Sequence, residues 1–277
     1  MTLEEIIQIA LDEDLGSGDH SSLATIPATA RGSAVMLAKE NGIVAGLQVA
    51  KQVFTQFDRK TKVELLKKEG QSLQAGDKIM KINGLSRSLL AAERTSLNFI
   101  QRLSGIATFT HKVVQKLEGL NTRVLDTRKT TPGLRMLEKM AVRAGGGENH
   151  RFGLYDMIMI KDNHIDFAGG ITEAISRTKA YLKKNHLDLK IEIEVRNFYE
   201  LENVLKTGDI QRVMLDNFSP DDLRSALKLI NGRFETEASG GISINNIRQY
   251  AETGVDFISV GALTHQIKSL DISLIAL

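Results

Sequence analysis

The chain has 277 residues, of which 42% are hydrophobic and 25% are charged, so it can bury a full core and still form a small second domain. Its 36 basic and 34 acidic residues are spread along the chain, which argues against nucleic acid as a partner. The absence of cysteine excludes disulfides, a thiolate zinc site and a cysteine nucleophile. No leader-like or bilayer-length apolar run occurs, so we expect a cytoplasmic globular protein with no membrane partner.

The first part of the chain predicts a small α/β domain with an antiparallel sheet, over residues 1–105. Thr2 and Glu5 form a capping-box pattern ahead of an amphipathic helix, which the Gly16-Ser17-Gly18-Asp19 segment ends. Short β-prone runs and helical stretches then follow one another. The expected strands are 34–38, 63–66 and 78–82, and the expected helices are 46–57 and 88–117, the latter interrupted at Ser104-Gly105.

From Thr122 onward, short apolar strands alternate with helical stretches, which is typical of an α/β barrel. The expected strands are 124–125, 157–160, 191–195, 213–215, 234–238 and 257–260. Six is fewer than the eight strands of a full barrel, so either the barrel is incomplete or a weak strand lies near 143–147. We assign the barrel to residues 106–264 and expect the tail, 265–277, to join the first domain.

Each barrel strand is followed by charged or glycine-rich residues, where barrel enzymes place their active sites. These are Asp126-Thr127-Arg128-Lys129, Lys161-Asp162-Asn163-His164, Glu194, Asp216-Asn217, Ser239-Gly240-Gly241 and Gly261. The two glycine segments lie where many barrels bind phosphate, and Ser239-Gly240-Gly241-Ile242 is expected to lead directly into a helix whose N-terminus faces the anion.

The acidic residues and Lys161 have structural alternatives. Lys161 either binds an anion or pairs with Glu194 or Asp216. Glu192 and Glu194 alternate with isoleucines, so both lie on one face of a strand, directed either into the barrel or toward helices and solvent. Asp216 either serves a site or caps the next helix.

Cations dominate the loops after the early strands, which favours a multiply anionic, phosphate-bearing substrate. They are Arg128, Lys129, His150, Arg151 and Lys161, with Arg94 on the helix that enters this region. His150 is a candidate general base or an anion or hydroxyl donor. No triad stands out, so covalent catalysis is not indicated.

These residues sit in longer segments that resemble the quinolinate phosphoribosyltransferases, the decarboxylating nicotinate-nucleotide pyrophosphorylases of NAD biosynthesis. The resemblance covers nearly the whole chain and is carried by Glu93-Arg94, 103–108, the segment Thr127-Arg128-Lys129-Thr130-Thr131-Pro132-Gly133, 145–147, Asn149-His150-Arg151, 161–164, 215–218 and 237–242. It implies an N-terminal α/β sandwich beside an incomplete TIM-like α/β barrel. The implied activity is a glycosyltransferase reaction of quinolinate with phosphoribosyl pyrophosphate, accompanied by Mg²⁺, that yields nicotinate mononucleotide, pyrophosphate and carbon dioxide.

The resemblance also implies a role for each site residue. Arg128, His150, Arg151 and Lys161 match ligands of the quinolinate carboxylates, and Lys129 lies between quinolinate and the phosphoribosyl group. Glu194 and Asp216 match the acidic pair near the ribose and the metal, which they hold through substrate and water. Ser239, Gly240, Gly241 and Gly261 match the 5′-phosphate loop. A homodimer, or a hexamer built as a trimer of dimers, is implied, with Arg94 reaching the neighbouring active site.

Rival interpretations and departures remain. One rival is a paralogue that acts on a different acid, such as the molybdenum-transport-associated members. Another is a non-catalytic sensor of phosphate ligands, against which the acidic pair argues. Nicotinate, with one carboxylate, would leave cations unpaired. The departures from the family pattern are Met140, Arg196 and His20-Ser21-Ser22.

Overall fold

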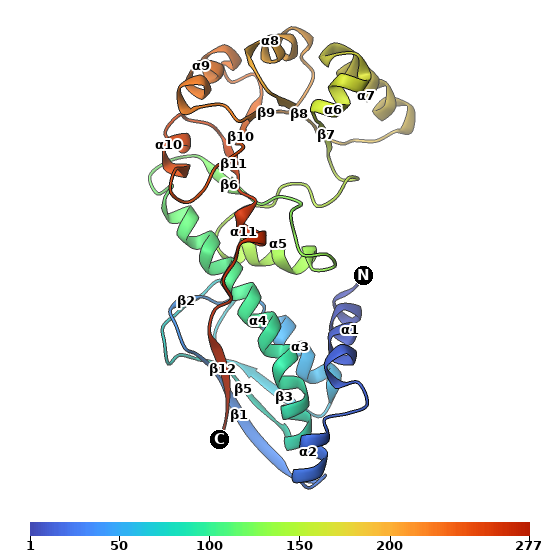
Figure 1. Cartoon of the computed structure of the whole chain (residues 1–277), viewed down its shortest axis with the longest axis vertical. Coiled ribbons are helices and arrows are strands. Elements are labelled where there is room, and N and C mark those ends of the chain that lie inside the picture. The colour runs from blue at the N-terminus through green and yellow to red at the C-terminus, as the bar shows by residue number, and fades with distance from the viewer. The chain divides into compact units, whose positions relative to one another are not determined.

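The computed structural model describes all residues, 1–277, and the chain divides into two compact units (Figure 1). The first unit comprises Met1–His111, Thr130–Gly146 and Leu263–Leu277, and the second comprises Lys112–Lys129 and Gly147–Ala262. Each unit has its own sheet. None of the helices combines the length and the apolar character that are needed to span a bilayer.

The first unit contains a four-stranded antiparallel sheet, as expected. Its strand order is β12-β1-β5-β3, formed by Ile272–Ala276, Arg31–Ala38, Lys78–Leu85 and Lys62–Leu65. A small second sheet pairs β2 (Gly42–Ile43) with β4 (Ser72–Leu73). Strand β12 pairs with β1 over Ala34↔Ala276 to Ala38↔Ile272, so the last strand of the chain completes the sheet of the first unit.

Six helices belong wholly or mainly to this unit. They are α1 (Leu3–Leu15), α2 (His20–Thr25), α3 (Leu47–Phe57), α4 (Ser86–Gln115), α5 (Arg135–Ala144) and α11 (Ala262–His265). The capping box at Thr2 and Glu5 is present, because each side chain accepts a hydrogen bond from the other residue's backbone N–H.

Helix α4 runs without a break, so the expected interruption at Ser104-Gly105 was wrong. Both residues are small because the chain packs closely against this part of the helix. A Cβ at Gly105 would collide with the backbone of Lys268, and the Ser104 hydroxyl accepts the N–H of Ala45 at 3.0 Å. Close packing, and not a turn, accounts for the glycine.

Helix α5 belongs to the first unit, although the expected second domain included it. The Glu138 carboxylate is fully buried and accepts from the Arg102 guanidinium of α4 at 2.6 Å. Gly145, after the helix, lies against Ala107 so closely that a Cβ would collide with its carbonyl oxygen. These contacts between α4 and the α5 segment connect distant parts of the sequence, which strand and helix patterns alone do not reveal.

The second unit contains a six-stranded parallel sheet in the order β6-β11-β10-β9-β8-β7. The strands are Arg123–Leu125, Phe257–Ser259, Glu235–Ser239, Arg212–Asp216, Ile191–Val195 and Ile158–Ile160. All six expected strands are therefore present. The residues near 143–147 add no strand, because α5 ends there and only an isolated bridge, Leu125↔Glu148, follows. The incomplete barrel is confirmed.

Helices lie along the outer side of this curved sheet in Figure 1. They are α6 (Asp162–Ala168), α7 (Ile171–Asn185), α8 (Phe198–Thr207), α9 (Pro220–Ile230) and α10 (Ile247–Ala251), and α11 of the first unit follows β11. Alternate residues of the strands are apolar and buried, such as Ile193, Val213 and Ala238. Since side chains alternate between the faces of a strand, the other face carries the polar set that contains Glu192, Glu194 and Glu237.

Candidate functional site

The sequence-predicted site residues gather in the second unit, with one exception. Eleven of the twelve belong to it, and Arg94 lies on α4 in the first unit. Lys161, Glu194, Asp216 and Ser239 stand at or directly beside the carboxyl ends of β7, β8, β9 and β10. The strands are parallel, so these ends share one edge of the sheet.

Arginine side chains meet in the loops at this edge. Burial and the like charge of Arg128 both lower the pKa of Arg151. The guanidinium of Arg151 also donates to the Met157 carbonyl at 3.2 Å, which holds it in place. Lys129, next to Arg128 in the β6 loop, is exposed. Cations that are held close enough to repel one another provide a strong attraction for a multiply charged anion.

Lys161 is paired with Glu194, which is one of the two alternatives derived from the sequence. The Lys161 ammonium donates to the Glu194 carboxylate at 2.8 Å, and the lysine side chain is 44% exposed. An ammonium that is so accessible can bind an anion while it stays next to the carboxylate, since its three hydrogens point in different directions.

Asp216 does not cap the following helix. Ser219 is the N-cap of α9 and accepts the N–H of Asp222, which excludes the capping alternative. Burial is the main cause that raises the pKa of Asp216, and the negative charge of Glu194 adds to it. The two carboxylates therefore form a region of excess negative charge at the sheet edge, which favours a nearby positive charge.

The Ser239-Gly240-Gly241 segment differs from the expectation in one respect. The helix that follows, α10, begins only at Ile247, because a turn closed by Ser243 and Asn246 comes first. No helix N-terminus lies at the glycines, so the expectation of a helix dipole there was wrong. The backbone remains suited to an anion, because a Cβ at Gly241 would meet no atom within 4 Å.

Replacing Gly240 with alanine is expected to destabilise the protein by about 2 to 3 kcal/mol. Gly240 has a φ of +95°, and a Cβ would collide with the Asn217 side chain and lie 2.9 Å from the Asn217 N. Gly254→Ala is a matched control, because its φ is +89° and a Cβ there has no atom within 4 Å. Urea denaturation should show a loss of only about 1 kcal/mol for the control. Equal losses of stability in the two variants would show that crowding against Asn217 adds nothing to the cost of the substitution at Gly240.

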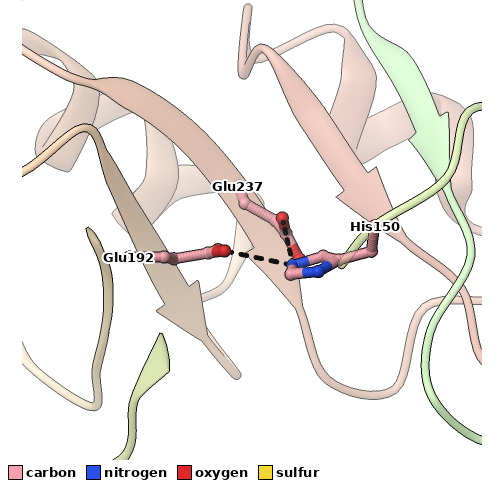
Figure 2. Close-up of side chains that lie close together, drawn as sticks. All are labelled: His150, Glu192 and Glu237. Atoms are coloured by element: carbon pink, nitrogen blue, oxygen red, sulfur yellow. Dashed lines mark ion pairs between the residues drawn. The ribbon is translucent and has the colours of Figure 1, made fainter. Parts of the chain in front are cut away.

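His150 lies between two buried carboxylates inside the sheet. Its Nε2 atom is 3.1 Å from Glu192 Oε2 and 3.4 Å from Glu237 Oε2, and both carboxylates are fully buried (Figure 2). The ring Nδ1 accepts the backbone N–H of Arg151 at 2.7 Å. Glu237 also pairs with the Arg212 guanidinium at 3.2 Å. The His150 ring is therefore fixed by partners at both nitrogens.

This group carries an excess of negative charge. With a neutral ring, Glu192 and Glu237 bring two carboxylates, and Arg212 shares its single positive charge between Glu237 and Glu235. Burial lowers the pKa of His150, whereas the contacts with Glu192 and Glu237 raise it. Burial and the charge of Glu237 raise the pKa of Glu192.

The hydrogen bond at Nδ1 decides where the ring hydrogen lies. An Nδ1 that accepts the Arg151 N–H carries no hydrogen, so the ring hydrogen is on Nε2, which faces the two carboxylates. The ligand atoms of His150, Glu192 and Glu237 lie within 4.8 Å of one another, as in a metal site.

Glu237 and Arg212 had no assigned role in the sequence. A signal was available, because Glu235, Glu237 and Ser239 alternate with Thr236 and Ala238 in one strand, as Glu192 and Glu194 do in another. Glu192 was expected only to share a face with Glu194. The structure separates their roles, since Glu192 contacts His150 and Glu194 contacts Lys161.

The departures noted in the sequence make local contacts. Arg196 pairs with Glu200 at 2.6 Å and with Asp166 at 3.2 Å, so it links α8 to α6 beside the end of β8. His20 begins α2, whose N-cap is Asp19. Met140 lies on α5 and is 36% exposed.

Two family models match the chain in succession. The N-terminal domain model of quinolinate phosphoribosyl transferase matches residues 19–104, and the C-terminal domain model matches residues 106–275. The two matches together cover both sheets.

Relatives of known name are similar over almost the whole chain. The chain is 45% identical to a chloroplastic nicotinate-nucleotide pyrophosphorylase [carboxylating] of Oryza sativa subsp. japonica, over 98% of this chain and 77% of the relative. It is also 45% identical to a probable nicotinate-nucleotide pyrophosphorylase [carboxylating] of Bacillus subtilis, over 99% and 93%.

Solved structures are similar to this chain over the same extent. The crystal structure of NadC from Streptococcus pyogenes superimposes with a TM-score of 0.94 at 41% identity, covering 99% of this chain and 97% of that one. The nicotinate-nucleotide pyrophosphorylase of Francisella tularensis gives 0.94 at 40% identity, covering 99% and 96%.

Proposed function

The chain belongs to the quinolinate phosphoribosyltransferase family, and on that premise we propose that it transfers the phosphoribosyl group of phosphoribosyl pyrophosphate to quinolinate. The products are nicotinate mononucleotide, pyrophosphate and carbon dioxide, as required in the de novo synthesis of NAD. The observation that carries this assignment is the set of cations beside the Glu194 and Asp216 carboxylates at one edge of the parallel sheet. Quinolinate brings two carboxylates, and its partner brings phosphates.

The reaction replaces one bond to the ribose with another. The ring nitrogen of quinolinate forms a bond to C1 of the ribose, and the bond from C1 to pyrophosphate breaks, with its electron pair leaving on the pyrophosphate oxygen. Positive charge develops on the ribose in between. Glu194 and Asp216 are the carboxylates that we propose to stabilise it, because an oriented charge in a partly buried site is most effective where charge develops.

The carboxylate next to the ring nitrogen then leaves as carbon dioxide. Once the nitrogen is bound to ribose it is positively charged, so it stabilises the electron pair left on the neighbouring carbon, which solvent protonates. We assign Arg128, Arg151 and Lys161 to the carboxylates of quinolinate and Lys129 to the space between the two substrates. His150, expected as a fourth carboxylate ligand, has both ring nitrogens directed at other groups of the protein. Ser239, Gly240, Gly241 and Gly261 are assigned to the 5′-phosphate. No covalent bond to the protein is needed in this scheme.

Mg²⁺ fits the donors that the structure offers. Glu194 and Asp216 present hard carboxylate oxygens, which Mg²⁺ prefers. Burial and, after it, the charge of Glu194 raise the pKa of Asp216, and a cation nearby would stabilise its ionised form. These two residues would hold the ion through substrate and water, since Lys161 already pairs with Glu194. The ion would neutralise charge on the leaving pyrophosphate.

We further propose a homodimer, or a hexamer of three dimers, in which Arg94 enters the neighbour's site. Arg94 is exposed on α4, and its guanidinium makes no ion pair within the chain. A cytoplasmic location is also proposed, and it rests on the sequence alone.

The assay that tests the function combines the protein with phosphoribosyl pyrophosphate, Mg²⁺ and either quinolinate, nicotinate or other aromatic acids. Nicotinate mononucleotide should form from quinolinate, and nicotinate should react at least about 100-fold more slowly, because it leaves cations unpaired. Chelation of Mg²⁺ should abolish the product. Turnover of a different acid would favour the paralogue, and phosphate-ligand binding without any turnover would favour the sensor.

A further inference from the structure

The group around His150 costs stability, so its presence calls for a functional explanation. Both oxygens of Glu192, Glu237 Oε1 and His150 Nε2 are buried and have no hydrogen-bond partner, so the contacts of Nε2 with the two carboxylates are ion pairs. Buried carboxylates with unpaired oxygens are expensive, and apolar residues of similar size would be at least as stable. The sheet nevertheless places both carboxylates on one ring nitrogen, from β8 and β10, as Figure 2 shows.

The contacts of the ring connect these carboxylates to Arg151. Glu192 and Glu237 hold Nε2, and Nδ1 on the other side of the ring accepts the Arg151 N–H. The His150 N–H donates to the buried Asp126 carboxylate at 2.9 Å, which fixes the backbone on the other side of the ring. A rotation of the ring would break the hydrogen bond at Arg151, so the two glutamates control where the backbone of Arg151 lies.

We infer that Glu192 and Glu237 are positioning residues for quinolinate, which act by holding the His150 ring so that it in turn holds Arg151. This inference rests on the proposed function, in which Arg151 binds a quinolinate carboxylate. His150 then serves as a link between the interior of the sheet and the arginine. In this role His150 does not donate a ring hydrogen to the substrate, because Nε2 faces the glutamates and Nδ1 faces the Arg151 N–H.

The kinetic test uses Glu192→Gln and Glu237→Gln, which keep the side-chain size. Each variant should raise the KM for quinolinate about tenfold while the KM for phosphoribosyl pyrophosphate changes less than about twofold. Glu235→Gln is the matched control, because Glu235 lies on the same strand and pairs with the same Arg212 at 3.1 Å, but does not contact His150. The control should leave both KM values unchanged.

A loss of thermal stability with unchanged KM values, or an equal rise in both KM values, would show a structural role and overturn the inference. If the glutamine variants do not fold, ¹⁵N NMR of the histidine-labelled wild-type protein tests the inference instead. The His150 Nδ1 should give the signal of an acceptor nitrogen without hydrogen, and a protonated Nδ1 at neutral pH would overturn the inference. This NMR signal does not depend on activity. Failure of the proposed function would appear separately, as wild-type protein that forms no product in the assay.

Discussion

Glu194→Gln is expected to lower kcat by about 100-fold to 1,000-fold while the KM for quinolinate changes less than about threefold. The carboxylate is nearly buried at the end of β8, with its side chain 10% exposed, and is fixed by Lys161 at 2.8 Å. It is therefore oriented before positive charge develops on the ribose. Glutamine keeps the size and removes the charge, so the loss should fall on the transition state and spare the binding of substrates.

Steady-state kinetics with both substrates varied would measure this effect. Folding should persist, because Lys161 is 44% exposed and water can solvate its charge when the partner is lost. Glu235→Gln again serves as the control, since it removes a carboxylate from the start of β10 in the same sheet, and its kcat should match that of the wild type. A kcat for Glu194→Gln within threefold of the wild type would contradict the assigned role.

Lys129→Ala and Arg94→Ala are each expected to lower kcat/KM by more than about 100-fold, because each removes a cation that a multiply anionic pair of substrates requires. Mixing the two inactive proteins under exchange of subunits should restore about a quarter of the wild-type activity. Half of the dimers would then be mixed, and one of the two sites in each mixed dimer would combine an intact Lys129 with the partner's intact Arg94.

The control for this experiment is Lys179→Ala, which removes a surface lysine of α7 that pairs with Asp209 and should leave the activity unchanged. If subunit exchange is shown independently and the mixture still has no activity, Arg94 acts within its own chain. Full activity of Arg94→Ala alone would remove this residue from the site.

Much of the second unit followed from local patterns. A parallel strand that is buried on the outer face and polar on the inner face has to alternate, and Ile191–Val195 shows this directly in the sequence. The charged residues after each strand were informative because the ends of parallel strands share an edge, whatever the exact curvature of the sheet. Capping at Thr2 and Glu5 was equally local, since both partners lie within one helical turn.

Two errors came from glycines whose structural role the sequence leaves open. Gly105 suggested an interruption of helix α4, but the residue is glycine because Lys268 packs against it. The glycines at 240 and 241 suggested the start of a helix, but a hydrogen-bonded turn at Ser243 and Asn246 delays it. A glycine indicates that a neighbouring group approaches the backbone closely or that the backbone φ is positive. The sequence does not distinguish between these two causes.

The sequence by itself determined the strands of the barrel, the fact that Glu192 and Glu194 share one face and the residues available for anions, because these depend on periodicity and on chemical type. Only the tertiary structure decided which partner each charge has. Glu194 pairs with Lys161, and Glu192 contacts His150. Glu237, which lies 45 positions after Glu192 in β10, contacts the same His150 ring. Partners of buried charges are chosen by strand register and sheet order, which arise only when the whole unit packs.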